Sequence, residues 1–201
     1  MRRFLSVLSL AVVVPLAACF DVDATIAITG DDQAETTMKM TIGADLVAML
    51  QGTDQDPCEG MEGSVQDDGS YVCTETKSGS IDELMNDPEI NEGMTIERRD
   101  GGLIYVAFDL SDLTGEMGLD DMGMGDEEMG AEEQAQMAAM MSGMFEGHSM
   151  VMRITGAKVI ETNGTISDDG KSASYELPLT ALFDEELELP ETFHALVKPG
   201  N

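Results

Sequence analysis

The sequence predicts an α+β domain, in which a meandering antiparallel β-sheet of hairpins carries short helices and one longer Met-rich helix on one face. Three observations support this fold class. Apolar and polar residues alternate with a period of two in several short runs, turn signals rich in Asp and Gly separate these runs, and the apolar period becomes helical between some of them. At 201 residues the chain is long enough for one domain with its own core.

The first hairpin and the first helix come from residues 22–50. Residues 22–28 and 34–42 alternate on either side of Gly30-Asp31-Asp32, which predicts two antiparallel strands. Residues 43–50 place their apolar side chains on one side of a helical turn, which predicts a short helix.

Two further units follow along the chain. A turn at residues 67–69 leads into a strand at 71–74, and Ser80-Ile81-Asp82-Glu83 is a capping box that opens a helix ending near residue 86. Residues 94–98 and 103–108 lie on either side of Asp100-Gly101-Gly102. Because an Asp-Gly step is a strong hairpin signal, we expect these two segments to be paired strands.

The C-terminal part contains the last group of predicted elements. The strands are residues 150–154, 158–161, 164–166, 172–177 and 193–197, with one helical turn at 180–183. We therefore expect a single domain from residue 19 to residue 201.

Residues 115–147 form an acidic, Met- and Gly-rich insert in this domain. No Lys or Arg occurs between Arg99 and Arg153. Residues 115–130 have low complexity and predict a loop, whereas residues 131–146 predict the longer helix. The apolar stripe of that helix is Met137, Met140, Met141, Met144 and Phe145.

The Met stripe has three interpretations. The plainest is core packing against the sheet, and the second is a binding surface for an apolar ligand or partner, since Met adapts to many shapes. The third is a copper site, because thioethers are soft ligands suited to Cu(I). Its donors would come from the insert and the strand after it, and they are Met122, Met124, Met129, His148, Met150 and Met152.

The charge of the chain excludes two classes of partner. With 40 acidic and 10 basic residues the net charge is -30, whereas nucleic-acid binding needs clustered Lys and Arg. The same charge opposes docking onto anionic lipid headgroups. The acidic runs match no calcium-loop template, so we expect no metal in them.

Residues 1–18 are typical of a bacterial lipoprotein signal peptide. Arg2 and Arg3 precede an apolar run, residues 4–16, that is too short to span a bilayer. Leu16-Ala17-Ala18-Cys19 then resembles a lipobox, which implies lipidation of Cys19, and two or three acyl chains anchor a protein firmly. We expect an envelope lipoprotein facing the periplasm, and Phe20 after the lipidated cysteine favours the outer membrane over the inner one.

Cys58 and Cys73 remain as a pair. In an exported chain such a pair predicts a disulfide, which on the chain-entropy model stabilises the fold by roughly 3 kcal/mol. A cysteine metal site is the alternative, but the sequence has no CxxC motif and no His near either cysteine.

The sequence offers few residues suited to catalysis. It has two histidines, His148 and His194, and no metalloprotease, phosphate-binding or dinucleotide-binding motif. His148-Ser149 is not a nucleophile elbow, because Val151 stands where the second Gly of that motif belongs. We therefore expect no enzymatic activity and no cofactor.

The sequence resembles the LppM-type bacterial lipoproteins from about Cys19 to Leu177, and it is also similar to lipoproteins of marine α-proteobacteria. The resemblance lies in residues 19–23 and in the turns within residues 158–164 and 168–171. It implies an α+β domain that binds a lipid or glycolipid at the envelope. The chain differs from that pattern by its Met-rich insert and by having no C-terminal transmembrane helix in this sequence.

These observations predict a lipid-anchored envelope lipoprotein with a non-catalytic domain for interaction or apolar-ligand binding. Its expected partners are the membrane, reached through the N-terminal lipid, and a lipid or another envelope protein. The alternative function is copper handling in the periplasm by the Met-rich segment.

Overall fold

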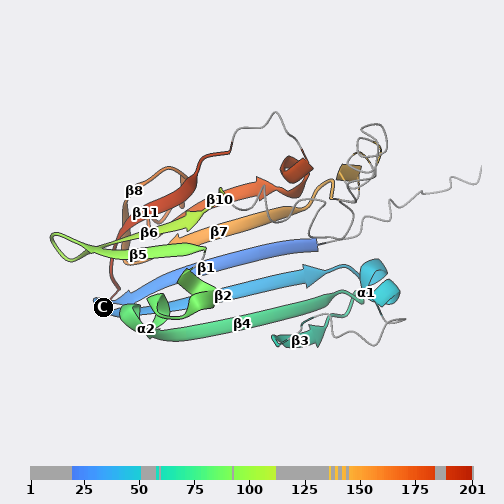
Figure 1. The fold of residues 1–201 in the computed structure, drawn as a ribbon, viewed down its shortest axis with the longest axis horizontal. Coiled ribbons are helices and arrows are strands. Elements are labelled where there is room, and N and C mark those ends of the chain that lie inside the picture. The colour runs from blue at the N-terminus through green and yellow to red at the C-terminus, as the bar shows by residue number, and fades with distance from the viewer. Residues whose placement is uncertain are drawn as a thin grey trace, which may run out of the picture.

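The computed structural model describes residues 20–50, 58, 60–91, 93–111, 136, 139, 142–143, 145–183 and 189–200. Within these residues eleven strands form two sheets, as Figure 1 shows. The strands are β1 (Phe20–Gly30), β2 (Gln33–Ile42), β3 (Glu62–Val65), β4 (Tyr71–Ser80), β5 (Met94–Arg99), β6 (Leu103–Asp109), β7 (Ser149–Thr155), β8 (Lys158–Thr162), β9 (Thr165–Ile166), β10 (Ser172–Pro178) and β11 (Thr192–Lys198). The helices are α1 (Ala44–Leu50), α2 (Ile81–Met85), α3 (Pro88–Asn91) and the 3-10 turn η1 (Leu179–Phe183).

The fold is mostly β, so the predicted α+β class is wrong. The longest helix of the described residues is α1, with seven residues, and none of their helices is long and apolar enough to cross a membrane. The strands take up more of the chain than expected, since β4 runs on from the predicted residues 71–74 to Ser80. Most of the predicted Met-rich helix at 131–146 lies outside the described residues.

The strands do not form the single antiparallel meander that the turns predict. The large sheet has the order β3-β4-β2-β1-β7-β10-β9, and the small sheet has the order β5-β6-β11-β8. β1 pairs in parallel with β7, and β8 pairs with β11 in the small sheet. Two parallel strands need a long connection between them, so no local turn signal in the sequence predicts their pairing.

The main core lies between the two sheets. Ile26 and Ile154 of the large sheet and Val106, Phe193 and Val197 of the small sheet are fully buried in one apolar cluster. Phe193 stacks on Phe108 and Tyr175, with ring centroids 6.0 and 5.8 Å away. α2 and α3 add Ile81, Leu84 and Ile90 to this cluster.

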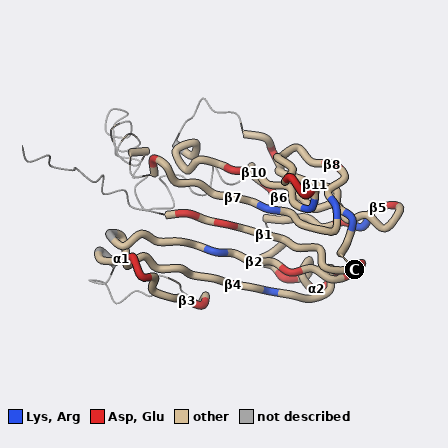
Figure 2. Tube along the Cα trace, turned by 180° about the vertical axis from the view of Figure 1, so that it is seen from behind, with Lys and Arg blue, Asp and Glu red and all other residues tan. Residues whose placement is uncertain are grey.

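The outer face of the large sheet is polar. Asp23 of β1 pairs with Lys39 of β2, and its carboxylate lies 3.5 Å from the guanidinium of Arg153 on β7. Figure 2 shows these charges as acidic positions on β1 and basic positions on β2 and β7. Because successive residues of a strand face opposite sides, Ala24 and its neighbours in register face inward.

A second, smaller core surrounds a disulfide between Cys58 and Cys73, as the sequence predicts. Their Cα atoms are 5.3 Å apart, and both residues are buried beside Ile42 and Val47. Gly63 on β3 has to be glycine here, because a Cβ atom would lie 2.6 Å from the Tyr71 ring and 2.9 Å from the Cys58 sulfur. The disulfide therefore ties the residues before β3 to β4.

Two of the predicted local signals form as expected. At the start of α2, the Glu83 amide donates to the Ser80 hydroxyl oxygen at 3.2 Å, and the Ser80 amide donates back to the Glu83 carboxylate at 2.9 Å. The Ser80 amide and hydroxyl hold the pKa of Glu83 below its usual range. Between β5 and β6, Gly101 and Gly102 both have positive φ, at 79° and 71°.

We expect replacement of both cysteines by serine, Cys58→Ser with Cys73→Ser, to lower the free energy of unfolding by about 3 kcal/mol, because the disulfide closes a loop of 15 residues. Urea denaturation followed by circular dichroism measures this difference. A reducing agent should lower the unfolding midpoint of the wild type and leave that of the double variant unchanged. Equal midpoints for the oxidised wild type and the double variant would contradict the prediction.

Candidate functional site

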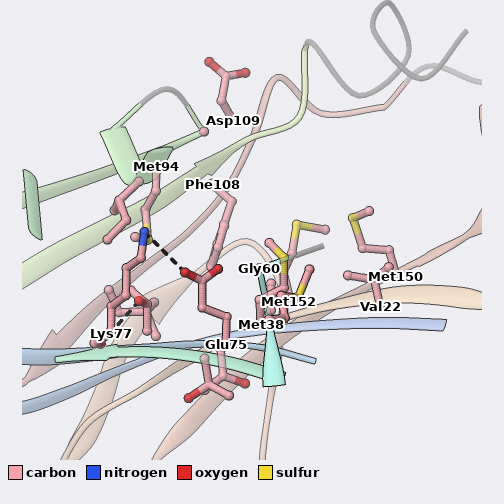
Figure 3. Close-up of a pocket in the computed structure, with 18 residues that line it drawn as sticks. Val22, Met38, Gly60, Glu75, Lys77, Met94, Phe108, Asp109, Met150 and Met152 are labelled. Carbon is pink, nitrogen blue, oxygen red and sulfur yellow. Dashed lines mark hydrogen bonds and ion pairs between the residues drawn. The ribbon is translucent and has the colours of Figure 1, made fainter. Parts of the chain in front are cut away.

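A cavity of about 600 Å³ lies between the large sheet and the β5–β6 side of the small sheet. Figure 3 shows the side chains that line it. The floor consists of inward-facing residues of β1, β2 and β7, and we call this cavity the intersheet groove. Its walls come from β4, from β5 and β6, from α3 and from Gly60 and Met61 before β3.

Strand register explains the composition of the floor. Ala24 pairs with Met38 on one side and with Met152 on the other, so these three residues form one row across β2, β1 and β7. Glu75 of β4 pairs with Met38 and extends the row. In the adjacent row, Val22 pairs with Met150. Ala24 is the small residue between two long side chains, which leaves space above β1.

The apolar lining is rich in thioethers. Five of the seven methionines whose side chains the structure describes line the intersheet groove: Met38, Met61, Met94, Met150 and Met152. Phe108 and Ile90 complete the wall under the small sheet. Met152 and Met150 are 3% and 8% exposed, whereas Met38 is 45% exposed. The groove is therefore lined by Met from its buried floor to its exposed side.

Charged groups lie at the edge of the groove. The ammonium of Lys77 is 3.5 Å from the Glu75 carboxylate and 3.2 Å from the Asp87 carboxylate, and Figure 3 shows the Glu75 and Lys77 side chains directed toward each other. Asp109 also lines the groove, and hydrogen bonds from the Ser111 hydroxyl and amide hold the pKa of its carboxyl below the usual range. An apolar interior with a polar edge suits a ligand that has an apolar body.

His148 and Asp21 join the starts of β7 and β1. The Nδ1 atom of His148 lies 3.3 Å from both oxygens of the Asp21 carboxylate, and the Ser149 amide donates to Asp21 at 3.0 Å. The side chain of His148 is 9% exposed. The residue considered as a copper donor is thus part of the contact that aligns β7 with β1.

Most of the other predicted site residues lie outside the described residues. These are the lipidation site Cys19, the stripe residues Met137, Met140, Met141 and Met144, and the copper donors Met122, Met124 and Met129. Phe145 is partly buried and packs against the main core. Met150 and Met152 do line the groove, together with methionines from elsewhere in the chain.

Sequence reasoning missed Met38, Met61 and Met94 as members of the site. A signal exists for Met38 alone: Met38 and Met40, like Met150 and Met152, are two residues apart, which places each pair on one face of its strand. That spacing does not show that the two strands flank β1. Only the register does so.

We expect Asp21→Ala to lower the free energy of unfolding by about 1–3 kcal/mol, because it leaves the Ser149 amide and the buried His148 ring without their carboxylate partner. Urea denaturation measures the effect, with Asp31→Ala in the exposed first turn as the matched control. If both variants unfold at the same urea concentration, the contact does not align β1 with β7 as described.

No protein-family model matches this sequence, and no curated protein is significantly similar to it. Among solved structures, the chain is similar to the folded domain of the LppM protein of Mycobacterium tuberculosis, determined by NMR. The identity is 16%, the match covers 92% of each chain, and the TM-score is 0.49. At these values the likeness is a loose one that concerns the fold alone.

Proposed function

We propose that this protein is a lipid-anchored lipoprotein of the bacterial cell envelope that binds an apolar ligand in the intersheet groove without chemical turnover. The observation that carries the proposal is the groove itself, about 600 Å³ in volume, with Met, Val, Ile and Phe as nine of its eighteen lining residues. Small-molecule sites are concave, mostly apolar and typically a few hundred Å³ in volume.

The ligand that we propose for the groove is a single acyl chain of a lipid. The lining extends along β1 from Val22 to Ile26, a distance of about 13 Å at the rise of a β-strand. Unbranched thioether side chains adapt to a flexible ligand. Each methylene group buried there contributes about 0.8 kcal/mol, so affinity should rise with the length of the chain.

The position of the predicted anchor supports a ligand that comes from a membrane. β1 begins at Phe20, directly after Cys19, and Val22 already lines the groove. Three extended residues span at most about 11 Å. A lipid on Cys19 would therefore hold the Val22–Met150 end of the groove close to the membrane surface, while the net charge of -30 keeps the rest of the domain away from anionic headgroups. Phe20, directly after Cys19, favours the outer membrane over the inner one as the location of this anchor.

We expect Cys19→Ser to release the protein from the membrane fraction, because the anchoring lipid is lost. Cell fractionation followed by immunoblotting measures the distribution between membrane and soluble fractions. Cys58→Ser is the matched control and should stay in the membrane fraction. If the Cys19→Ser protein stayed in the membrane fraction, the assignment of the lipid anchor to Cys19 would be wrong.

We expect Ala24→Leu to weaken binding of an apolar ligand at least tenfold, because the larger side chain occupies the space above β1. The measurement is displacement of the fluorescent probe N-phenyl-1-naphthylamine by straight-chain alcohols of increasing length, using residues 19–201 with Cys19→Ser. Ala27→Leu is the matched control, since Ala27 lies on the same strand but faces outward.

The control variant should bind the probe like the wild type, and affinity should rise with alcohol length in both. Failure of the wild-type protein to bind any neutral apolar probe would overturn the proposed function. Equal affinities of the Ala24→Leu and Ala27→Leu proteins would place the ligand outside the groove.

A further inference from the structure

The methionines that line the intersheet groove differ in their access to solvent. Met94 and Met150 are each 8% exposed, and Met152 is 3% exposed. Met61 is partly buried and packs against the second core. Met38 is 45% exposed, which makes it the one methionine among the exposed large apolar side chains of the described residues. A solute in water therefore reaches the thioether of Met38 more readily than that of any other methionine in this lining.

A thioether brings a reactivity to the groove that an alkyl side chain lacks. Leu and Met have similar volumes and replace each other in cores at small cost, so packing alone does not require Met at this place. The sulfur of Met accepts an oxygen atom from a peroxide and becomes a sulfoxide, whereas Leu does not react. In that step the sulfur loses two electrons, the O–O bond of the peroxide breaks, and the second peroxide oxygen leaves as water or an alcohol. The side chain thereby changes from apolar to polar.

The position of Met38 makes this change important for binding. Met38 lies beside Ala24 of β1, the small residue that leaves space above the strand, and beside Glu75 of β4 on its other side. Neither the Ala24 methyl group nor the Glu75 carboxylate can donate a hydrogen bond to a sulfoxide oxygen. Figure 3 shows Met38 among the residues that line the groove. A sulfoxide there would stay hydrated, and an apolar ligand would have to displace that water without replacing its hydrogen bonds.

We propose that Met38 is an oxidation site through which peroxides control ligand binding in the intersheet groove. This role rests on the proposed function, since it concerns the occupancy of the same groove. Conversion of Met38 to the sulfoxide lowers the affinity for an apolar ligand about tenfold. A bound ligand in turn covers the sulfur and slows its oxidation. Methionine sulfoxide reductases reverse the step with two electrons from thiols and release the oxygen as water.

The test uses residues 19–201 with Cys19→Ser, in which the two remaining cysteines form the disulfide, so that no free thiol competes for the oxidant. This parent protein is treated with hydrogen peroxide, the peroxide is removed with catalase, and peptide mass spectrometry measures the oxidation of each methionine. We expect Met38 to be oxidised faster than the buried Met150 and Met152, and more slowly in the presence of saturating dodecanol. Equal rates for the three methionines, or no protection by dodecanol, would contradict the proposed role.

Ligand binding is measured by the fluorescence of N-phenyl-1-naphthylamine before and after the peroxide treatment. The oxidised parent protein should bind the probe about tenfold more weakly, whereas Met38→Leu should keep its affinity after the same treatment. Met40→Leu is the matched control, because Met40 lies on the same strand, is partly buried and does not line the groove. This control should lose affinity as the parent protein does. The methionines of residues 115–147 are identical in all three proteins, so their oxidation affects each equally.

The measurements distinguish failure of this role from failure of the proposed function. If the untreated protein does not bind the probe, the proposed function is wrong and the role of Met38 fails with it. If the untreated protein binds the probe and the oxidised protein binds it equally well, only the role of Met38 is wrong. That role is also wrong if Met38→Leu loses as much affinity on oxidation as the parent protein. Circular dichroism of the oxidised protein should match that of the untreated protein, which shows that the lost binding does not come from unfolding.

Discussion

The parallel pairing of β1 with β7 is the contact on which the rest of the structure depends. It joins residues 22–27 to residues 150–155 and thereby connects the two antiparallel halves of the large sheet. Asp21 reinforces the start of the pair, since its carboxylate accepts from the Ser149 amide 128 residues further along the chain. The same pairing sets Met152 beside Ala24 and Met150 beside Val22. Without it the floor of the intersheet groove would not exist.

Each of the two cores fixes one side of this groove. The main core packs the small sheet onto β1, β7 and β10 and fixes the wall that carries Phe108 and Met94. The second core fixes the opposite side, where the Cys58–Cys73 disulfide holds Gly60 and Met61 against β4. The inner face of β2 between the two cores is left uncovered at Met38, so this methionine is 45% exposed, whereas Met152 in the same row is 3% exposed.

Charge and apolar surface are separated on the two faces of the large sheet. The outer face pairs acidic with basic side chains, as Asp23 does with Arg153, and the inner face carries the core and the groove. A net charge of -30 on such a chain favours solubility and opposes contact with anionic surfaces. Attachment through a lipid at Cys19, as proposed, would therefore place the domain at a membrane without requiring any attraction between its surface and the headgroups.

The sequence alone determined the local elements and the disulfide, because their causes are local. Alternation with a period of two predicts β1 and β2, the Asp-Gly step predicts the β5–β6 turn, and the Ser80–Glu83 capping box predicts α2. The pair of cysteines in an exported chain predicts the bond between Cys58 and Cys73.

Only the tertiary structure decided the two sheets, the parallel β1–β7 pair and the site. A strand's residues encode which of its faces is apolar, but they do not encode which distant strand it pairs with, and that choice depends on the combined packing of all strands. The sequence alone therefore points to function in the insert, where eight methionines lie close together. The groove is instead lined by methionines from separate segments, such as Met38 of β2 and Met152 of β7, and strand pairing alone places these two on either side of Ala24.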